Sequence, residues 1–363
     1  MTTRRNFLRG VGAATGLAFC SCHMLDTARA QQAPRHLPVT IKGKRVKTID
    51  AHAHCYFHDV LNLMGSEASK ILPPVKGVPE HFIVVEQRLK EMDAMGIDME
   101  VLSVNPFWYR ADRDLAAQVV KLQNERLAEL CASKPERFAA FASLALQYPD
   151  LAVQQLDDAM KKHGLRGAAI GGSVSGTDFS DPKFHPVWAK AEELGAVLFI
   201  HPQSTPELAS RFKGNGWLSN TIGNPLDTTI ALQHLIFEGT LDRFPKLKIL
   251  AAHGGGYLGS YAARDDHACF VSPQNCNPDI KLKKQPSEYL NQLHFDALVF
   301  TPEGLRHLVA QVGASQVMLG TDHPIPWETH PVDHVFATET LTDAQKIAIL
   351  GGNAARLFGF NNS

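Results

Sequence analysis

Short apolar runs alternate with amphipathic stretches along most of the chain. The apolar runs are rich in aliphatic, aromatic and β-branched residues, which is typical of strands buried in a sheet. Eight such runs cover residues 47–54, 99–104, 138–146, 165–171, 196–202, 246–256, 293–299 and 317–324. The stretches between them have helical spacing, and this predicts helices over residues 87–95, 112–133, 150–163, 185–195, 226–239, 302–312 and 343–350, before a closing segment at 353–360.

This order of elements decides the fold class. Strands that alternate with helices are typical of parallel pairing, because each helix carries the chain back to the start of the next strand. Eight strand–helix units predict a closed (β/α)₈ TIM barrel, here as a single domain over residues 31–363. An open doubly wound sheet is the rival fold. It fits less well because no Gly-x-Gly-x-x-Gly loop follows an early strand.

Residues 1–30 have the pattern of a cleavable signal peptide. Arginines are the only charged residues before a moderately apolar run over residues 11–22, and Ala28-Arg29-Ala30 offers a small-x-small cleavage site. The apolar run is too short to span a bilayer. The stretch TRRNFL resembles the twin-arginine export signal. We therefore expect a periplasmic protein.

Composition and charge exclude several classes of protein. The 363 residues are 44% hydrophobic and 20% charged, with a net charge of −1, so a large core is available and no basic patch indicates a nucleic-acid partner. No second apolar segment predicts a membrane span. Cys269 and Cys276 are candidates for a disulfide in an oxidising compartment, although their spacing leaves the pairing open.

Candidate chemistry gathers where the predicted strands end. His52 and His54 end the first strand, His201 follows the fifth, His253 follows the sixth and Asp322 follows the eighth. Residues i and i+2 of a strand project from one face, so His52 and His54 point in one direction. Because the carboxyl ends of barrel strands meet at one mouth, we expect all five side chains to lie together.

Imidazole and carboxylate groups in this number suit a zinc-type divalent ion. We expect His52, His54, His201 and Asp322 to hold one ion, with Zn²⁺ as the expected metal and Mn²⁺ as the alternative. His253 would then lie beside the open position, where an imidazole can act as a general acid or base. Trp108, just past the second strand, is a candidate for the wall of a substrate pocket.

Longer motifs carry a resemblance to a known family. They are IDAHAH, RLKEMDAMGIDMEVLSVNP, HPVWAKAEELGAVLFIHP, NPLDTTIALQHLIFEGTLDRFPKLKILAAHGGGYLGSYAARDDH, FDALVFTPEGLRHLV and VMLGTDHP. They resemble the amidohydrolase superfamily, and within it the branch of aminocarboxymuconate-semialdehyde decarboxylase and related metal-dependent decarboxylases. The similarity covers nearly all of residues 46–360.

The resemblance implies a mononuclear barrel enzyme, usually dimeric. It implies that His52, His54, His201 and Asp322 bind the metal, that Asp322 also takes part in catalysis, and that His253 is the catalytic histidine. It further implies that Arg264 binds the substrate carboxylate across the dimer interface. Arg88 is the candidate for a second carboxylate-binding arginine. The fourth strand ends in LRGAAIGG, without the lysine that binuclear members of the superfamily carry there.

We therefore predict a metal-dependent carboxy-lyase that acts on a carboxylated aromatic or dienoic small molecule. A hydrolase of a lactone, ester or amide would use the same site and is the first alternative. A non-catalytic metal-binding protein is the second alternative, although His253 would then have no purpose.

Overall fold

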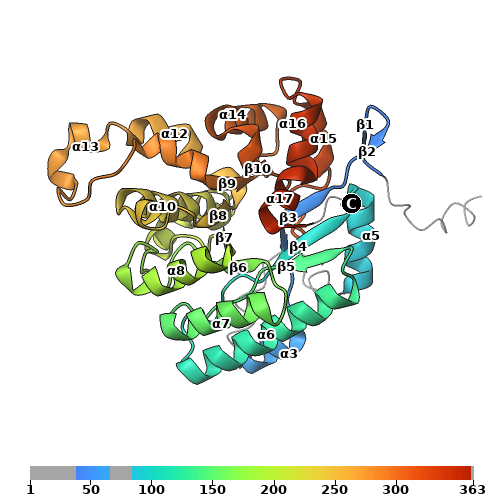
Figure 1. Cartoon of the computed structure of the whole chain (residues 1–363), viewed down its shortest axis with the longest axis horizontal. Coiled ribbons are helices and arrows are strands. Elements are labelled where there is room, and N and C mark those ends of the chain that lie inside the picture. Colours follow the sequence, from blue (N-terminus) through green and yellow to red (C-terminus); the bar gives the residue numbers. More distant parts are fainter. Residues whose placement is uncertain (1–37, 66–83, 361–363) are drawn as a thin grey trace, which may run out of the picture.

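The computed structural model describes residues 38–65 and 84–360, and its centre is a closed barrel of eight parallel strands (Figure 1). The predicted signal peptide lies outside the described residues. Each predicted strand contains one of the observed strands. These are β3 (Ile49–His54), β4 (Met99–Ser103), β5 (Phe138–Ala140), β6 (Gly167–Ile170), β7 (Val197–Ile200), β8 (Lys248–Ala251), β9 (Leu293–Asp296) and β10 (Val317–Met318).

The barrel closes through two joints between a three-stranded and a five-stranded sheet. Ala142 bridges Ala168 at one joint and Ala53 bridges His323 at the other, both in parallel register. At the second joint the amide of His54 donates to the carbonyl of His323 at 2.7 Å. The first and last strands of the barrel therefore meet. This closure confirms the predicted TIM barrel and excludes the open doubly wound sheet.

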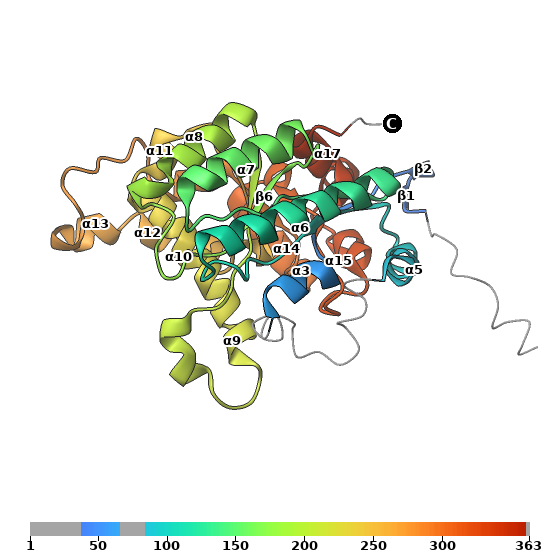
Figure 2. The same ribbon diagram turned by 90° about the horizontal axis from the view of Figure 1, so that it is seen from below.

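Helices surround the barrel (Figure 2). They are α3 (His58–Leu63), α5 (Val85–Met95), α6 (Arg113–Ser133), α7 (Pro149–Lys161), α8 (His185–Leu194), α9 (Leu218–Thr221), α10 (Gly223–Phe237), α11 (Thr240–Arg243), α12 (Leu258–Asp265), α13 (Ala268–Val271), α14 (Pro302–Val312), α15 (Pro331–Ala337), α16 (Asp343–Ile347) and α17 (Asn353–Phe358). Helix α6 shows why these segments fold as they do: the Asp112 side chain accepts from the amide of Leu115 at its N-terminus, and Val119, Val120 and Leu127 are buried.

Aromatic side chains fill the barrel beneath the mouth. The rings of Phe141 and Phe199 are stacked 5.1 Å apart, and Phe358 from α17 packs against Phe141. The ring of His52 lies 5.0 Å from that of Phe199. The barrel is therefore a packed core and not a channel, and the mouth has an apolar floor.

Several elements were not expected from the sequence. A two-stranded hairpin, β1 (Thr40–Ile41) and β2 (Lys44–Arg45), precedes the barrel. Helix α12 packs against α14, and α13, which follows it, projects from the barrel in both views; the two helices are called the arm (Figures 1 and 2). A disulfide between Cys269 and Cys276 crosslinks the end of the arm. Among the described residues, no helix combines the length and apolar character needed to span a membrane.

Candidate metal centre

Four side chains converge at the barrel mouth, as the sequence predicted. His52 and His54 end β3, His201 follows β7 and Asp322 follows β10, and all four are buried. Each offers a ligand atom, and these atoms all lie within 4.8 Å of one another. Asp322 Oδ1 lies 2.8 Å from His54 Nε2 and 3.3 Å from His52 Nε2. The spacing suits one ion held between them.

Hydrogen bonds behind the ligands orient both rings of the His-x-His pair. His52 Nδ1 donates to Asp296 Oδ2 at 2.6 Å. The Ser103 hydroxyl donates its proton to the carbonyl of Ala53. Ser103 Oγ therefore accepts a hydrogen bond from His54 Nδ1 at 2.8 Å. These bonds turn both Nε2 atoms inward, 3.1 Å apart. At that distance, one cation can bind both nitrogens once His52 has lost its Nε2 proton.

His201 gives an independent indication of a metal. Both of its ring nitrogens are buried, and neither has a hydrogen-bond partner among the described residues. A buried polar atom without a partner is costly, and a bound ion would satisfy it. Burial and the neighbouring imidazoles lower the pKa of His201 well below its ordinary value, so the ring is neutral and able to ligate. The chain thus contains a single-metal site that three imidazoles and one carboxylate form.

Metal affinity should rise with pH because of one ligand. Burial opposes the charged form of His52, but Asp322 and Asp296 outweigh it and raise the pKa of His52 to about 10 in the metal-free protein. Burial lowers the pKa of His54 to about 4, so that ring is already neutral. Binding must therefore displace one proton between pH 6 and pH 8, and the dissociation constant should fall about tenfold for each unit that the pH rises. Competition with a chromophoric chelator measures this, and a flat profile would contradict it.

His253 lies beside the ligand set without joining it. Its Nε2 is 3.7 Å from Asp322 Oδ2, and its ring centroid is 5.3 Å from that of His201. The backbone of His253 has a φ of +56°, a region that a residue with a side chain rarely adopts, and Asp296 Oδ2 accepts from its amide at 2.9 Å. His253 Nδ1 is buried and has no hydrogen-bond partner in residues 38–65 and 84–360. The ring is thus held in place, and at least one of its nitrogens is free for chemistry.

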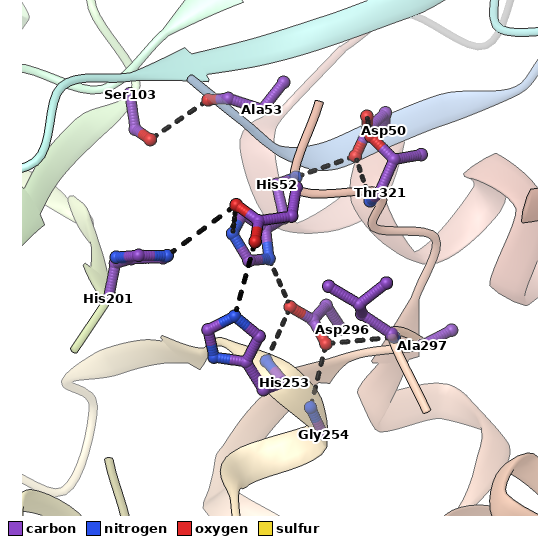
Figure 3. Close-up of polar contacts among 12 residues, drawn as sticks. Asp50, His52, Ala53, Ser103, His201, His253, Gly254, Asp296, Ala297 and Thr321 are labelled. Carbon is purple, nitrogen blue, oxygen red and sulfur yellow. Dashed lines mark hydrogen bonds and ion pairs between the residues drawn. The ribbon is translucent and has the colours of Figure 1, made fainter. Parts of the chain in front are cut away.

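Asp296 connects the metal ligands to His253, and the sequence analysis missed it. Its carboxylate accepts from the His52 ring and from the amides of His253, Gly254 and Leu298 (Figure 3). Asp296 is fully buried at the end of β9. A carboxylate at the end of the seventh predicted strand, in line with the other strand ends, is the signal that could have found it.

A cavity of about 450 Å³ opens beside the ligands. His54, His201 and Asp322 form one side of it. Its aromatic lining residues are Tyr56, Phe107, Trp217 and Trp327. The indole rings of Trp217 and Trp327 are nearly parallel, 5.7 Å apart. A cavity of this size, with aromatic walls and polar groups at one end, suits a one-ring organic molecule.

The structure corrects the position expected for Trp108. Its side chain is fully buried, and its indole N–H donates to the carbonyl of Leu144 at 2.8 Å. The described cavity is lined instead by the preceding residue, Phe107. Trp108 is therefore part of the core and does not face a substrate.

Arg88 also lies elsewhere than the sequence predicted. It is buried, its Nη1 is 2.7 Å from Glu100 Oε2, and its Nη2 donates to the carbonyl of His54. His323 completes this network, with Nδ1 2.6 Å from Glu100 Oε1. A guanidinium that is already paired in the core is not available to a substrate carboxylate. Arg88 supports the backbone of a metal ligand instead.

Arg264 lines a different cavity, of about 640 Å³, between α12 and the segment closed by the disulfide. Within one chain it does not line the cavity beside the metal ligands. The role of Arg264 across a dimer interface stays a prediction.

Comparisons with known proteins agree with the geometry. The family model described as amidohydrolase matches residues 49–360. The chain is 32% identical over 281 residues to 2-amino-3-carboxymuconate-6-semialdehyde decarboxylase of Dictyostelium discoideum, covering 76% of each chain. It is 32% identical over 289 residues to gamma-resorcylate decarboxylase of Rhizobium radiobacter, covering 76% of this chain and 87% of that one.

A solved structure with a bound metal has the same fold. It is dihydroxybenzoic acid decarboxylase from Polaromonas sp. with bound manganese and the inhibitor 2-nitroresorcinol. It matches with a TM-score of 0.77 and 25% identity, and the match covers 88% of this chain and 98% of that one.

Proposed function

The chain belongs to the amidohydrolase family, and from this premise we propose that it is a metal-dependent decarboxylase of carboxylated aromatic or dienoic acids. The observation that carries the proposal is His253, a histidine with a free ring nitrogen next to a complete set of four metal ligands. A storage site needs no such group. The aromatic walls of the cavity suit a flat, conjugated substrate.

The residues of the chain have separate roles in this reaction. A divalent cation at the site would orient the acidic oxygens of the substrate and stabilise the negative charge on them. His253 donates a proton to the carbon that bears the carboxylate. The bond from that carbon to the carboxylate then breaks, carbon dioxide leaves, and the bonding electrons stay on the substrate and restore its conjugation. His253 recovers its proton from solvent, so the carboxylate is replaced by hydrogen overall.

A panel of substrates tests the proposed reaction. The metal-loaded protein is incubated with hydroxybenzoic and dienoic acids and, separately, with lactones, esters and amides. We expect carbon dioxide to form from at least one of the acids. Acid release from the second group, without carbon dioxide from the first, would show that the same site is hydrolytic.

We further propose Zn²⁺ as the resident ion. Three neutral imidazoles and one carboxylate are a donor set typical of zinc. The manganese in the Polaromonas relative makes Mn²⁺ the alternative. Elemental analysis of the purified protein distinguishes the two.

We also propose that the arm α12–α13 pairs with a second copy of the chain. Phe270 is 83% exposed and Val271 is 73% exposed, and apolar side chains so open to water are typical of an interface. Arg264 lies on the same arm. Pairing would bury the apolar side chains and bring Arg264 to the substrate of the partner.

Arg264→Ala is expected to raise KM about tenfold for an acid that the enzyme decarboxylates, with little change in metal content, because the substrate carboxylate loses a charged hydrogen-bond donor. Steady-state kinetics measure this, with Arg306→Ala as the matched control. Arg306 is exposed and pairs with Glu303 on α14. An unchanged KM, or a monomer in light scattering, would remove the proposed role of Arg264.

Finally, we propose that residues 1–30 direct export to the periplasm by the twin-arginine route. The disulfide between Cys269 and Cys276 supports this, because such crosslinks persist in oxidising compartments.

A further inference from the structure

Arg110 is a cation at the metal cavity that has no role in the proposed decarboxylation. It lies in the segment between β4 and α6 and lines the cavity that His54, His201 and Asp322 border. Among the described residues, it is the only lysine or arginine that lines this cavity.

The guanidinium of Arg110 is not engaged elsewhere. Its side chain is exposed and forms no hydrogen bond or ion pair within the part of the chain that the structure describes. Arg113, three residues later, provides a contrast, because its Nη1 donates to Asp150 Oδ1 at 3.0 Å. The Arg110 guanidinium therefore faces the metal cavity without a partner among the described residues and is available to a bound molecule.

The position of Arg110 indicates which end of a substrate it meets. Arg110 also lines a second cavity of about 340 Å³, which shares Phe107, Gln203 and Ser204 with the first. None of the metal ligands lines this second cavity. Arg110 therefore stands at the border between the two cavities, and the ligands of the metal cavity do not line that border.

Charge decides on which side of that border an anion would bind. The second cavity is lined by Glu207 and Asp227, so negative charge is unfavourable there. In the metal cavity, the one carboxylate among the lining residues is Asp322, which is a ligand. An anionic group beside Arg110 is therefore best placed inside the metal cavity, at the border that Arg110 lines.

We propose that Arg110 binds a second carboxylate of the substrate, so that the preferred substrates are one-ring diacids with one carboxylate at the metal and another at the guanidinium. This proposal rests on the proposed function, because it takes the carboxylate at the metal as the one that leaves as carbon dioxide. The planar fork of the guanidinium can donate two parallel hydrogen bonds to the second carboxylate. The walls formed by Trp217 and Trp327 hold the ring between the two ends.

Binding of inert probes tests the proposal without turnover. Calorimetry on manganese-loaded protein compares benzoate with benzene-1,3-dicarboxylate and benzene-1,4-dicarboxylate. We expect at least one dicarboxylate to bind about tenfold more tightly than benzoate, because it gains a charged hydrogen bond. Arg110→Ala should bring that dicarboxylate to within about twofold of benzoate while leaving benzoate unchanged. Arg110→Lys should keep part of the preference, since it restores the charge but not the fork.

Arg113→Ala is the matched control, since it removes the same charge three residues away and outside both cavities. It should leave the preference intact. The proposal is overturned if the native protein shows no preference for either dicarboxylate. It is also overturned if Arg110→Ala weakens benzoate and dicarboxylate by the same factor. Neither result depends on carbon dioxide release, so a failure of the proposed decarboxylation would be seen separately.

Discussion

Replacing His253 by asparagine is expected to lower the rate of carbon dioxide release about 10³-fold while each chain keeps one metal ion. His253 is close to the ligands, with Nε2 3.7 Å from Asp322 Oδ2, but it is not one of the four groups that converge. It is the group placed to deliver the proton. Asparagine is the suitable replacement because the backbone at this position has a φ of +56°, which asparagine tolerates better than alanine.

Two measurements on this variant decide the role of His253. Elemental analysis reports the bound metal, and the initial rate of carbon dioxide release reports the chemistry. His307→Asn serves as the control, because His307 lies on α14, where its ring contacts Ser260. If His253→Asn loses its metal as well as its activity, His253 is a ligand and the division of roles proposed here is incorrect.

Replacing Asp296 by asparagine is expected to weaken metal binding by about 10- to 100-fold, and turnover at limiting metal should fall with it. The Asp296 carboxylate accepts from His52 Nδ1 at 2.6 Å and so directs His52 Nε2 to the site. It also accepts from the amides of His253 and Gly254. An amide offers one acceptor oxygen in place of two, and its NH₂ group would meet donors.

Chelator competition measures this loss of metal affinity. Asp98→Asn is the control, because Asp98 is also a buried carboxylate and accepts from the amide of Thr48, but it is not a ligand or a neighbour of one. Native affinity in Asp296→Asn would show that the ligands need no orientation from this side chain. Equal loss in both variants would indicate general destabilisation instead.

The sequence predicted the barrel and the metal ligands because both depend on repeating geometry. Parallel strands end at one mouth, so a histidine or aspartate at a strand end has a predictable place even when hundreds of residues separate it from its partners. His52, His201 and Asp322 were found in this way. Short helices inserted after a barrel strand follow no such repeat. Helices α12 and α13, which lie between β8 and β9, were missed for this reason.

Asp296 and Ser103 were missed for a different reason. They contact the ring nitrogens that face away from the metal, so their role appears only when the ring orientation of His52 and His54 is known. Asp296 does stand at a strand end, but that position alone does not show that its carboxylate faces the His52 ring.

The prediction for Trp108 was wrong because its place just past the second strand does not fix the direction of its side chain. The prediction for Arg88 rested on a motif resemblance, which does not reveal the partner of Arg88 in the core. Phe107 lines the cavity, whereas Trp108 beside it points into the core. Arg88 was read as available to a substrate. Arg88 lies on α5 and its partner Glu100 lies on β4. The Glu100 carboxylate neutralises the Arg88 guanidinium inside the protein.

Titration of the metal-free protein with Mn²⁺, while carbon dioxide release is followed from the best acid of the panel, tests the central claim most directly. We expect no carbon dioxide release without metal, a rate that rises linearly with added Mn²⁺, and a plateau at one ion per chain. Release that is independent of the metal, or a rate that continues to rise to two ions per chain, would contradict a single ion held by residues 52, 54, 201 and 322.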